Sequence, residues 1–236
     1  EQNGGYGMGN QEGINYAVSC LEADYVIIAN PDIHVTPRCI RRVKDALDKT
    51  QGAVAASARV KDPQGGELFS YWTLLPLWKD LLDTGLVTRR LFKAMLNTPS
   101  YRLAYAGDED CRLVDAVPGS FFMLKTGLLT PGEIKEVFDK HIFLYYEEKV
   151  LGQKFRKMGL KTVLVTDESY VHAHSVSIDK SFKRIVDKQR LLHRSKLYYY
   201  KEYLGTGPAG MAAARAVLGL VLAEVWFLTV VCRMQW

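Results

Sequence analysis

The sequence contains little cysteine, and none of it is arranged in a close pair. Four cysteines occur in the 236 residues, without a Cys-x-x-Cys spacing: Cys20, Cys39, Cys111 and Cys232. A disulfide framework or a cysteine-built metal centre is therefore disfavoured, and a reducing compartment is expected. Internal repeats and low-complexity tracts are also absent, which disfavours a repeat architecture.

Basic residues are missing from the first part of the chain. No Lys or Arg occurs between Glu1 and Ile33, so this stretch has no basic glycine-rich loop of the kind that holds phosphate groups. Over the whole chain, 31 Lys and Arg outnumber 26 Asp and Glu, and the net charge is +5. A surplus of this size suits an anionic ligand or an anionic membrane surface, but it is also common on ordinary soluble proteins.

The first 13 residues are polar and glycine-rich, unlike a signal peptide. They are interpreted as an internal loop, and we expect the sequence to begin partway into a longer protein. The overall composition, 48% hydrophobic and 24% charged, is that of one large globular domain or of a domain with an appendage.

Helix and strand patterns alternate over the first 180 residues. We expect a helix at 11–21, a strand buried on both faces at 25–29, a helix that starts at Thr36-Pro37, and a strand at 53–60. Residues 68–106 are rich in aromatic residues without a clear period and are interpreted as an inserted region over the sheet. Strand character around a Pro-Gly break, a helix from Glu147 to Gly159 and a strand at 160–165 follow. The alternation predicts an α/β domain over residues 1–180.

Residues 181–236 differ in composition and are interpreted as an appendage. A basic, aromatic segment with helical spacing comes first, and a nearly all-apolar segment at 211–231 follows. The first segment predicts a basic amphipathic helix at an anionic membrane surface, through Lys183, Arg184, Lys188, Arg190, Arg194 and Lys196. The second segment either dips into lipid or forms an ordinary buried or dimer-forming helix. No nucleic-acid-binding motif accompanies the basic residues, so nucleic acid is not an expected partner.

A single carboxylate follows the first expected strand, in the segment Asn30-Pro31-Asp32. Ligands of α/β sheets bind where strands end, and a carboxylate there suits Mg²⁺ or Mn²⁺ held against a diphosphate. Pro31 ends the strand because it has no N–H group, and it directs the turn that carries Asp32. The alternative is a plain strand-ending turn, in which these three residue types are common.

Several segments, taken in order, carry a family resemblance. "NGGYGMGNQEGI", "NPD", "PGS", "FLYYEE" and "VHAHSVS" together resemble the landmarks of the family-two inverting glycosyltransferases of GT-A fold, which build bacterial surface polysaccharides. The resemblance covers about residues 3–177. It implies a Rossmann-like mixed sheet flanked by helices, whose first strand, with a nucleotide-binding acid, would precede Glu1. The N-P-D form favours a rhamnosyl-type enzyme with a dTDP-sugar donor, and UDP-sugars remain open.

The resemblance also assigns residues to the donor and to a metal. It implies that Asp32 binds Mg²⁺ or Mn²⁺ at the donor diphosphate, next to Asn30, and that His172 or His174 completes the metal site, with His172 favoured. The glycine-rich segment is implied to form a loop near the nucleotide and donor sugar, through Asn3, Gly5, Tyr6, Gly9 and Asn10.

The acceptor side is implied to be lined by Gly119 and Ser120, and Glu147 and Glu148 match the acidic pair of the family. An inverting transfer needs a base for the acceptor hydroxyl, and a carboxylate with a like-charged neighbour suits this role. The second position favours Glu148, although Glu147 remains open. The alternative is that the acids only complement the N-terminal dipole of a helix.

The expected protein is therefore a cytoplasmic enzyme, peripheral on the inner face of the cell membrane. Its partners would be a nucleotide-sugar donor and a glycan acceptor. Linkage of the acceptor to polyprenyl diphosphate and a homodimer through the C-terminal helices are further options. One alternative is an α/β nucleotidyltransferase, but such an enzyme would need a basic glycine-rich loop, and no Lys or Arg occurs between Glu1 and Ile33. The other is a catalytically degenerate transferase domain that serves as a membrane-bound assembly partner.

Overall fold

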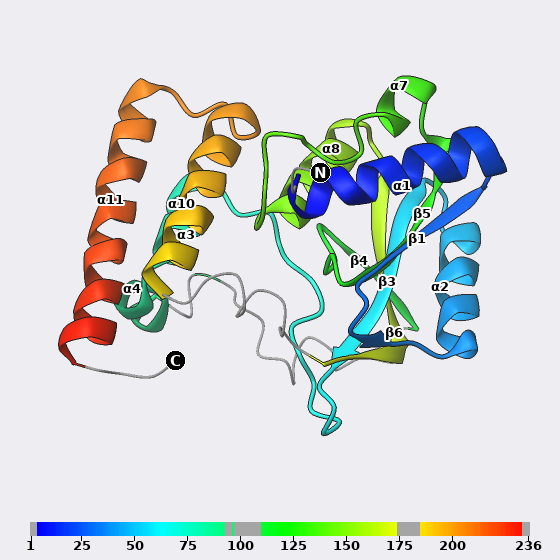
Figure 1. The fold of residues 1–236 in the computed structure, drawn as a ribbon, viewed down its shortest axis with the longest axis horizontal. Helices are drawn as coiled ribbons and strands as arrows, with labels where there is room; N and C mark the ends of the chain where they lie inside the picture. Colours follow the sequence, from blue (N-terminus) through cyan, green and yellow to red (C-terminus); the bar gives the residue numbers. More distant parts are fainter. Residues whose placement is uncertain (1–3, 93–95, 97–109, 174–184, 233–236) are drawn as a thin grey trace. The chain divides into compact units, whose positions relative to one another are not determined.

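The computed structural model describes residues 4–92, 96, 110–173 and 185–232, which form two compact units (Figure 1). The first unit contains 4–74, 110–143 and 147–173 and holds a mixed β-sheet flanked by helices, so the α/β prediction is confirmed. The second unit is helical. Its main part is residues 185–232, and residues 75–92, 96 and 144–146 group with it.

The sheet of the first unit has the strand order β1-β5-β3-β6-β2, and β4 pairs with β6 beside this path. Strands β3 and β6 run parallel, and every other described pair is antiparallel. The bounds are Tyr25–Ala29 for β1, Ile33–His34 for β2, Ala53–Lys61 for β3, Cys111–Val114 for β4, Phe121–Lys125 for β5 and Lys161–His172 for β6. Because β4 and β2 pair with opposite ends of β6, residues at 32–34 reach the end of the longest strand.

Helices cover both faces of this sheet (Figure 1). Helix α2 (Pro37–Lys49) packs on one face, and α1 (Gly5–Leu21) and α8 (Glu147–Lys157) pack on the other. Successive residues of β5 alternate between the two cores: Phe121 and Met123 join the α2 side, and Phe122 and Leu124 join the α1 and α8 side. The central strands are therefore apolar on both faces, as a covered sheet requires.

Helix α2 and strand β3 confirm the predictions made for them. The Thr36 hydroxyl accepts a hydrogen bond from the Cys39 N–H at 3.1 Å, and Pro37 occupies the first helical turn. Both signals are local, since a capping side chain and a proline act on the adjacent backbone. Strand β3 then follows the turn at Gly52 and pairs with β5 and β6.

The glycine-rich start of the chain was wrongly interpreted as a loop. Its described part lies in α1, which begins at Gly5 and continues through the predicted 11–21 helix. Tertiary contacts hold this end, because the Gln11 amide donates to the Ile134 carbonyl at 2.7 Å and accepts from the Phe138 N–H at 2.9 Å. Packing and hydrogen bonds here outweigh the poor helix propensity of glycine.

Strand β1 is an edge strand among the described residues and not a strand buried on both faces. It pairs with β5 alone, only Ile28 is buried, and Ile27 is 40% exposed. The prediction was wrong because a short apolar run does not distinguish a central strand from an edge strand.

Strand β6 is longer than predicted and carries a bulge. Its pairing with β3 shifts after Ala58–Val165, so that Ser169 faces Arg59 and residues 166–168 are extra. The bulge holds two acids that pair with α2: Asp167 lies 2.9 Å from Arg42, and Glu168 lies 2.6 Å from Arg38. The strand then continues to His172, which the sequence had placed beyond it.

Short helices complete the first unit and begin the second. Their bounds are Thr126–Leu128 for η1, Pro131–Ile134 for α7, Leu77–Leu82 for α3 and Leu86–Leu91 for α4. Helices α3 and α4 belong to the stretch interpreted as an insertion, and they group with the C-terminal helices.

The predicted C-terminal helices are present in the second unit. Helix α10 (Ile185–Glu202) and helix α11 (Pro208–Trp226) pack side by side, and α11 continues as a π-helix, η2 (Phe227–Val231) (Figure 1). Residues 208–231 are long and apolar enough to cross a membrane by length and composition, which is weak evidence on its own. Lys196 does not belong to the surface-facing basic residues, because it is buried beside Asp80; Lys183 and Arg184 lie outside the described residues.

Candidate functional site

Asp32 and His172 lie next to each other at the end of β6. The antiparallel pairing of β2 with β6 sets Ile33 opposite His172, and the Ala173 N–H donates to the Asp32 carbonyl at 3.0 Å. As a result, Asp32 Oδ1 lies 3.3 Å from His172 Nε2. The structure thus brings together the two residues that the sequence assigned to a metal. His174 lies outside the described residues.

The donor set at this point fits a hard divalent cation. Asp32 Oδ1 is screened from water and receives no hydrogen bond, and an imidazole nitrogen faces it. A carboxylate oxygen and an imidazole nitrogen both suit Mn²⁺, and the carboxylate suits Mg²⁺. Among the described residues, no group of three His, Cys, Asp or Glu side chains gathers around one point. A cation held by this pair alone would leave positions for water or phosphate oxygens.

A two-residue turn, Gly119-Ser120, connects the Asn30–Asp32 segment to the acidic pair. On one side, the Asn30 N–H donates to the Ser120 carbonyl at 2.8 Å. On the other side, the Gly119 N–H donates to Glu148 Oε1 at 3.2 Å. The hydroxyl groups of Ser120 and Tyr170 lie 2.7 Å apart, which fixes the turn against β6. Residues predicted for the donor, the acceptor and the base are thus linked through consecutive hydrogen bonds.

Glu147 and Glu148 begin α8, and the two carboxyl groups have different surroundings. Glu147 is 6% exposed, and its Oε1 atom is buried without a hydrogen-bond partner. Glu148 is partly accessible and receives the N–H group of Gly119. Glu148 also borders a small space lined by Val117, Phe122 and Leu151, so its inner side faces apolar groups.

Burial raises the pKa of both carboxyl groups. Burial, with a smaller repulsion from Glu148, raises the pKa of Glu147 to about 8. Burial also raises the pKa of Glu148, while backbone N–H groups, including that of Gly119, and the nearby Lys149 lower it. Two close carboxyl groups ionise in steps, and Glu148, which receives an N–H donor, carries the first charge. The helix N-terminus alone does not explain this arrangement, since its dipole favours ionised acids.

The backbone just before the pair adopts an unusual conformation. Tyr145 and Tyr146 have φ angles of 70° and 75°, in the left-handed region that bulky residues rarely occupy. Such conformations persist only where surrounding contacts hold them, and they concentrate at functional sites. The Tyr146 hydroxyl donates to the Asp80 carboxylate at 2.5 and 2.7 Å. The "FLYY" letters gave no signal of this strain.

The residues predicted to form a donor-binding loop lie, where the structure describes them, in helix α1. Tyr6 turns its hydroxyl to the Gly119 carbonyl at 2.5 Å, and the Asn10 amide donates to the Tyr6 carbonyl within α1. Gly5 begins the helix with φ of +81°, and a Cβ atom there would clash with the Phe143 carbonyl. A Cβ atom at Gly9 would have no neighbour within 4 Å. Asn3 lies outside the described residues. The structure therefore joins Tyr6 to the turn and the acidic pair, and it uses the Asn10 side chain within the helix.

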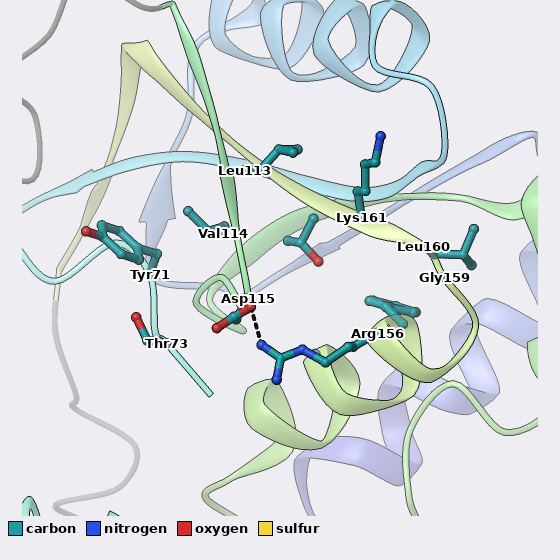
Figure 2. Close-up of a pocket in the computed structure, with 12 residues that line it drawn as sticks. Tyr71, Thr73, Leu113, Val114, Asp115, Arg156, Gly159, Leu160 and Lys161 are labelled. Atoms are coloured by element: carbon teal, nitrogen blue, oxygen red, sulfur yellow. Dashed lines mark hydrogen bonds and ion pairs between the residues drawn. The ribbon is translucent and has the colours of Figure 1, made fainter. Parts of the chain in front are cut away.

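A cavity of about 400 Å³ lies elsewhere on the first unit, as Figure 2 shows. Arg156 and Lys161 line it, and they lie at the opposite ends of α8 and β6 from Glu148 and His172. Asp115 also lines the cavity, and its carboxylate accepts hydrogen bonds from Arg156 at 2.7 Å and from the Leu74 N–H at 2.8 Å. None of the predicted site residues lines this cavity, so it is not the site that they form.

Comparison with known proteins gives one kind of relative. The chain is 28% identical over 160 residues to an N-acetylglucosaminyl-diphospho-decaprenol L-rhamnosyltransferase of Mycobacterium tuberculosis, in each of two strains, CDC 1551 / Oshkosh and ATCC 25618 / H37Rv. The alignment covers 66% of this chain and 50% of the relative. The chain thus spans about half the length of the curated relatives it matches. No family model matches the sequence.

Proposed function

We propose that this chain contains the catalytic centre of an inverting glycosyltransferase of GT-A fold, in the second glycosyltransferase family. The observation that carries the proposal is the Gly119-Ser120 turn, which links Asn30, two residues before Asp32, to Glu148 through hydrogen bonds at 2.8 and 3.2 Å. The two relatives are named as rhamnosyltransferases, which supports the same reaction class. The donor would be a nucleotide-diphosphate sugar, dTDP-rhamnose or a UDP-sugar.

Glu148 is the general base in this proposal. It accepts the proton of the acceptor hydroxyl while that oxygen forms a bond to the anomeric carbon, from the face opposite the diphosphate. The bond between the anomeric carbon and the diphosphate oxygen breaks, and its electron pair leaves with the nucleoside diphosphate. Glu147 keeps its proton below about pH 8, so a single charge remains on the pair and is available at Glu148.

Asp32 and His172 would hold a Mg²⁺ or Mn²⁺ ion at the donor end of the site. When bound, the ion would supply positive charge to the diphosphate as it leaves. Asp32 is suited to this role because its Oδ1 atom is desolvated and lacks a hydrogen-bond donor. Asn30 in place of a second acid lowers the negative charge of the site, so we expect the ion to bind weakly without the donor.

The acceptor is proposed to be a glycan on a polyprenyl diphosphate, presented at the inner face of the membrane. The relatives are named for an N-acetylglucosaminyl-diphospho-decaprenol acceptor. The 24 residues from Pro208 to Val231 form a helical segment that contains an 18-residue stretch with a mean hydropathy of 1.9, and Leu220 on the segment is 72% exposed. Its acid, Glu224, is satisfied by the N–H groups of Leu86 and Val87 at 3.1 and 3.0 Å.

The neighbouring helix favours lipid contact at the surface over a full span. Helix α10 packs along α11 and exposes the basic side chains of Arg190, Arg194 and Lys201. Carrying this charged helix into the hydrocarbon region would be costly, whereas basic side chains beside an apolar helix suit an anionic lipid surface. The alternative is that the apolar face of α11 contacts a second copy of the chain in a homodimer.

Donor turnover tests the proposed reaction. Hydrolysis and transfer would be measured with a panel of UDP- and dTDP-sugars, in Mg²⁺ or Mn²⁺, for the wild-type chain, Asp32→Ala and Glu148→Gln. We expect turnover with one nucleotide class, and a loss of about 100-fold or more in each variant. Asp45→Asn and Glu12→Gln are matched controls, because both acids are exposed and lie outside the site.

Two other outcomes would contradict parts of the proposal. Turnover that Asp32→Ala abolishes and Glu148→Gln leaves intact would move the base to Glu147. A wild-type chain that neither binds nor turns over any donor, with either metal, would overturn the enzymatic function and favour the assembly-partner alternative.

A further inference from the structure

Gly119 receives and donates hydrogen bonds at two atoms, and each bond involves a side chain from a different helix. Its carbonyl accepts from the Tyr6 hydroxyl of α1 at 2.5 Å. Its N–H donates to Glu148 Oε1 of α8 at 3.2 Å. The Tyr6 hydroxyl and the Glu148 carboxylate are therefore connected through one residue.

The space around Gly119 leaves little freedom to this arrangement. A Cβ atom built at Gly119 would lie 2.9 Å from the Tyr6 hydroxyl and 3.2 Å from Glu148 Oε1, closer than ordinary contacts. The Tyr6 ring is itself fixed, because it packs edge-on against Phe138 with the ring centroids 5.7 Å apart. Gly7 permits this packing, since a Cβ atom there would meet Phe138 at 3.3 Å.

We propose that Tyr6 is a positioning residue for the acidic pair. Its hydroxyl holds Gly119 so that the Gly119 N–H faces the Glu148 carboxylate. This inference rests on the proposed function and gives Tyr6 a different role from the donor contact implied by the family resemblance. The hydroxyl is suited to the task because burial, with the nearby Glu148 and Glu147 charges, raises the pKa of Tyr6. Tyr6 therefore stays protonated and can donate at any pH where the pair titrates.

The consequence lies in the charge state of Glu148. A hydrogen bond to the ionised form of a carboxyl group lowers its pKa, so a Gly119 N–H that loses its fixed direction lets the pKa of Glu148 rise. The charged or titratable groups around Glu148 are Glu147 and Lys149 on its own helix, Tyr6 on α1 and Tyr170 on β6. Tyr6→Phe leaves the other three in place and removes only the hydroxyl.

The experiment compares Tyr6→Phe with wild type in the full chain, using the donor that the wild type turns over. We expect the acidic limb of the kcat profile to move to higher pH by about half to one unit. At neutral pH, kcat should fall about three- to tenfold, while KM for the donor stays within about twofold. Tyr16→Phe is the matched control, because Tyr16 lies on the same helix and is exposed. Thermal unfolding would verify that both variants fold.

A raised KM for the donor with an unchanged pH profile would overturn the inference and return Tyr6 to donor binding. A Tyr6→Phe variant identical to wild type would overturn it as well.

A second readout does not depend on turnover. Carbon-13 NMR titration of the glutamate carboxyl groups, with the Glu148 signal assigned through Glu148→Gln, should give a higher Glu148 pKa in Tyr6→Phe. A shifted titration in a chain without donor turnover would support the positioning role and contradict the proposed function. Donor turnover with an unshifted Glu148 titration in Tyr6→Phe would support the proposed function and contradict the positioning role of Tyr6.

Discussion

Lys196 places its ammonium group 2.8 Å from the carboxylate of Asp80, with side-chain exposures of 5% and 1%. The hydroxyl of Thr84 also contacts the ammonium group, and the Tyr146 hydroxyl donates to both carboxylate oxygens. The ion pair is thus buried with partners on both sides, which is the condition under which a buried charge pair is tolerated.

We predict that Lys196→Ala destabilises the second unit by about 3–5 kcal/mol, because it leaves the Asp80 carboxylate buried without its cation. Urea unfolding of the full chain, followed by tyrosine and tryptophan fluorescence, measures the change. Lys201→Ala on the same helix is the control; its exposed pair with Glu202 should contribute less than about 1 kcal/mol. Equal effects of the two variants would show that the buried pair does not stabilise the unit.

Glu147 should make stability depend on pH. Its pKa is about 8 in the folded chain and 4.5 as an ordinary side chain, so the folded state retains a proton that the unfolded state has lost between those values. The free energy of unfolding should therefore fall as the pH rises from about 4.5 to 8. In Glu147→Gln this contribution disappears, and the variant should gain stability relative to wild type at pH 8. A pH profile unchanged by Glu147→Gln would contradict the raised pKa.

Metal binding should depend on Asp32 and His172 together. We predict that Mn²⁺ binding, measured by electron paramagnetic resonance with a nucleoside diphosphate present, weakens at least tenfold in both Asp32→Asn and His172→Ala. Asp45→Asn serves as the exposed control. If His172 instead carries a proton and pairs with Asp32 as an ion pair, Mn²⁺ binding will be the same in all four proteins.

The exposed apolar face of α11 should bind anionic lipid. We predict that Leu220→Glu reduces cosedimentation with phosphatidylglycerol vesicles several-fold, because it introduces a charge at a site 72% exposed on the proposed lipid face. Leu113→Glu is the control, since Leu113 is also an exposed leucine but lies on β4. Loss of a dimer in sedimentation, with lipid binding unchanged, would assign this face to a second copy of the chain.

The parts of the fold that the sequence predicted are those with local signals. Helix α2 begins where Thr36 and Pro37 placed it, because an N-cap and a first-turn proline act within one turn of the chain. The start of α1 could not be predicted in this way. Its glycines favour a loop, and the contacts of Tyr6 and Gln11 with residues more than 100 positions away maintain the helix.

The same distinction holds for the site. The order of the motifs along the sequence identified Asp32 and Glu148 as candidate site residues. Which residues lie beside each of them is set by tertiary contacts, which the sequence does not reveal. Asp32 meets His172 through β2, a strand of two residues with no detectable periodicity. The Asp80–Lys196 pair gave no local signal either, so a basic residue in an amphipathic pattern was assigned to the surface although its partner lies 116 positions earlier.

The bulge in β6 adds three residues to the strand without changing the pairing on either side of it. Its three extra residues, 166–168, could be removed and Ser169 would still follow Val165 in register along β3, so His172 would keep its place beside Asp32. Deleting Ser169 alone would instead reverse the faces of Tyr170 and His172. Removal of the whole bulge is therefore compatible with the Asp32–His172 pair. It would, however, remove Asp167 and Glu168, the carboxylates that pair with Arg42 and Arg38 of α2.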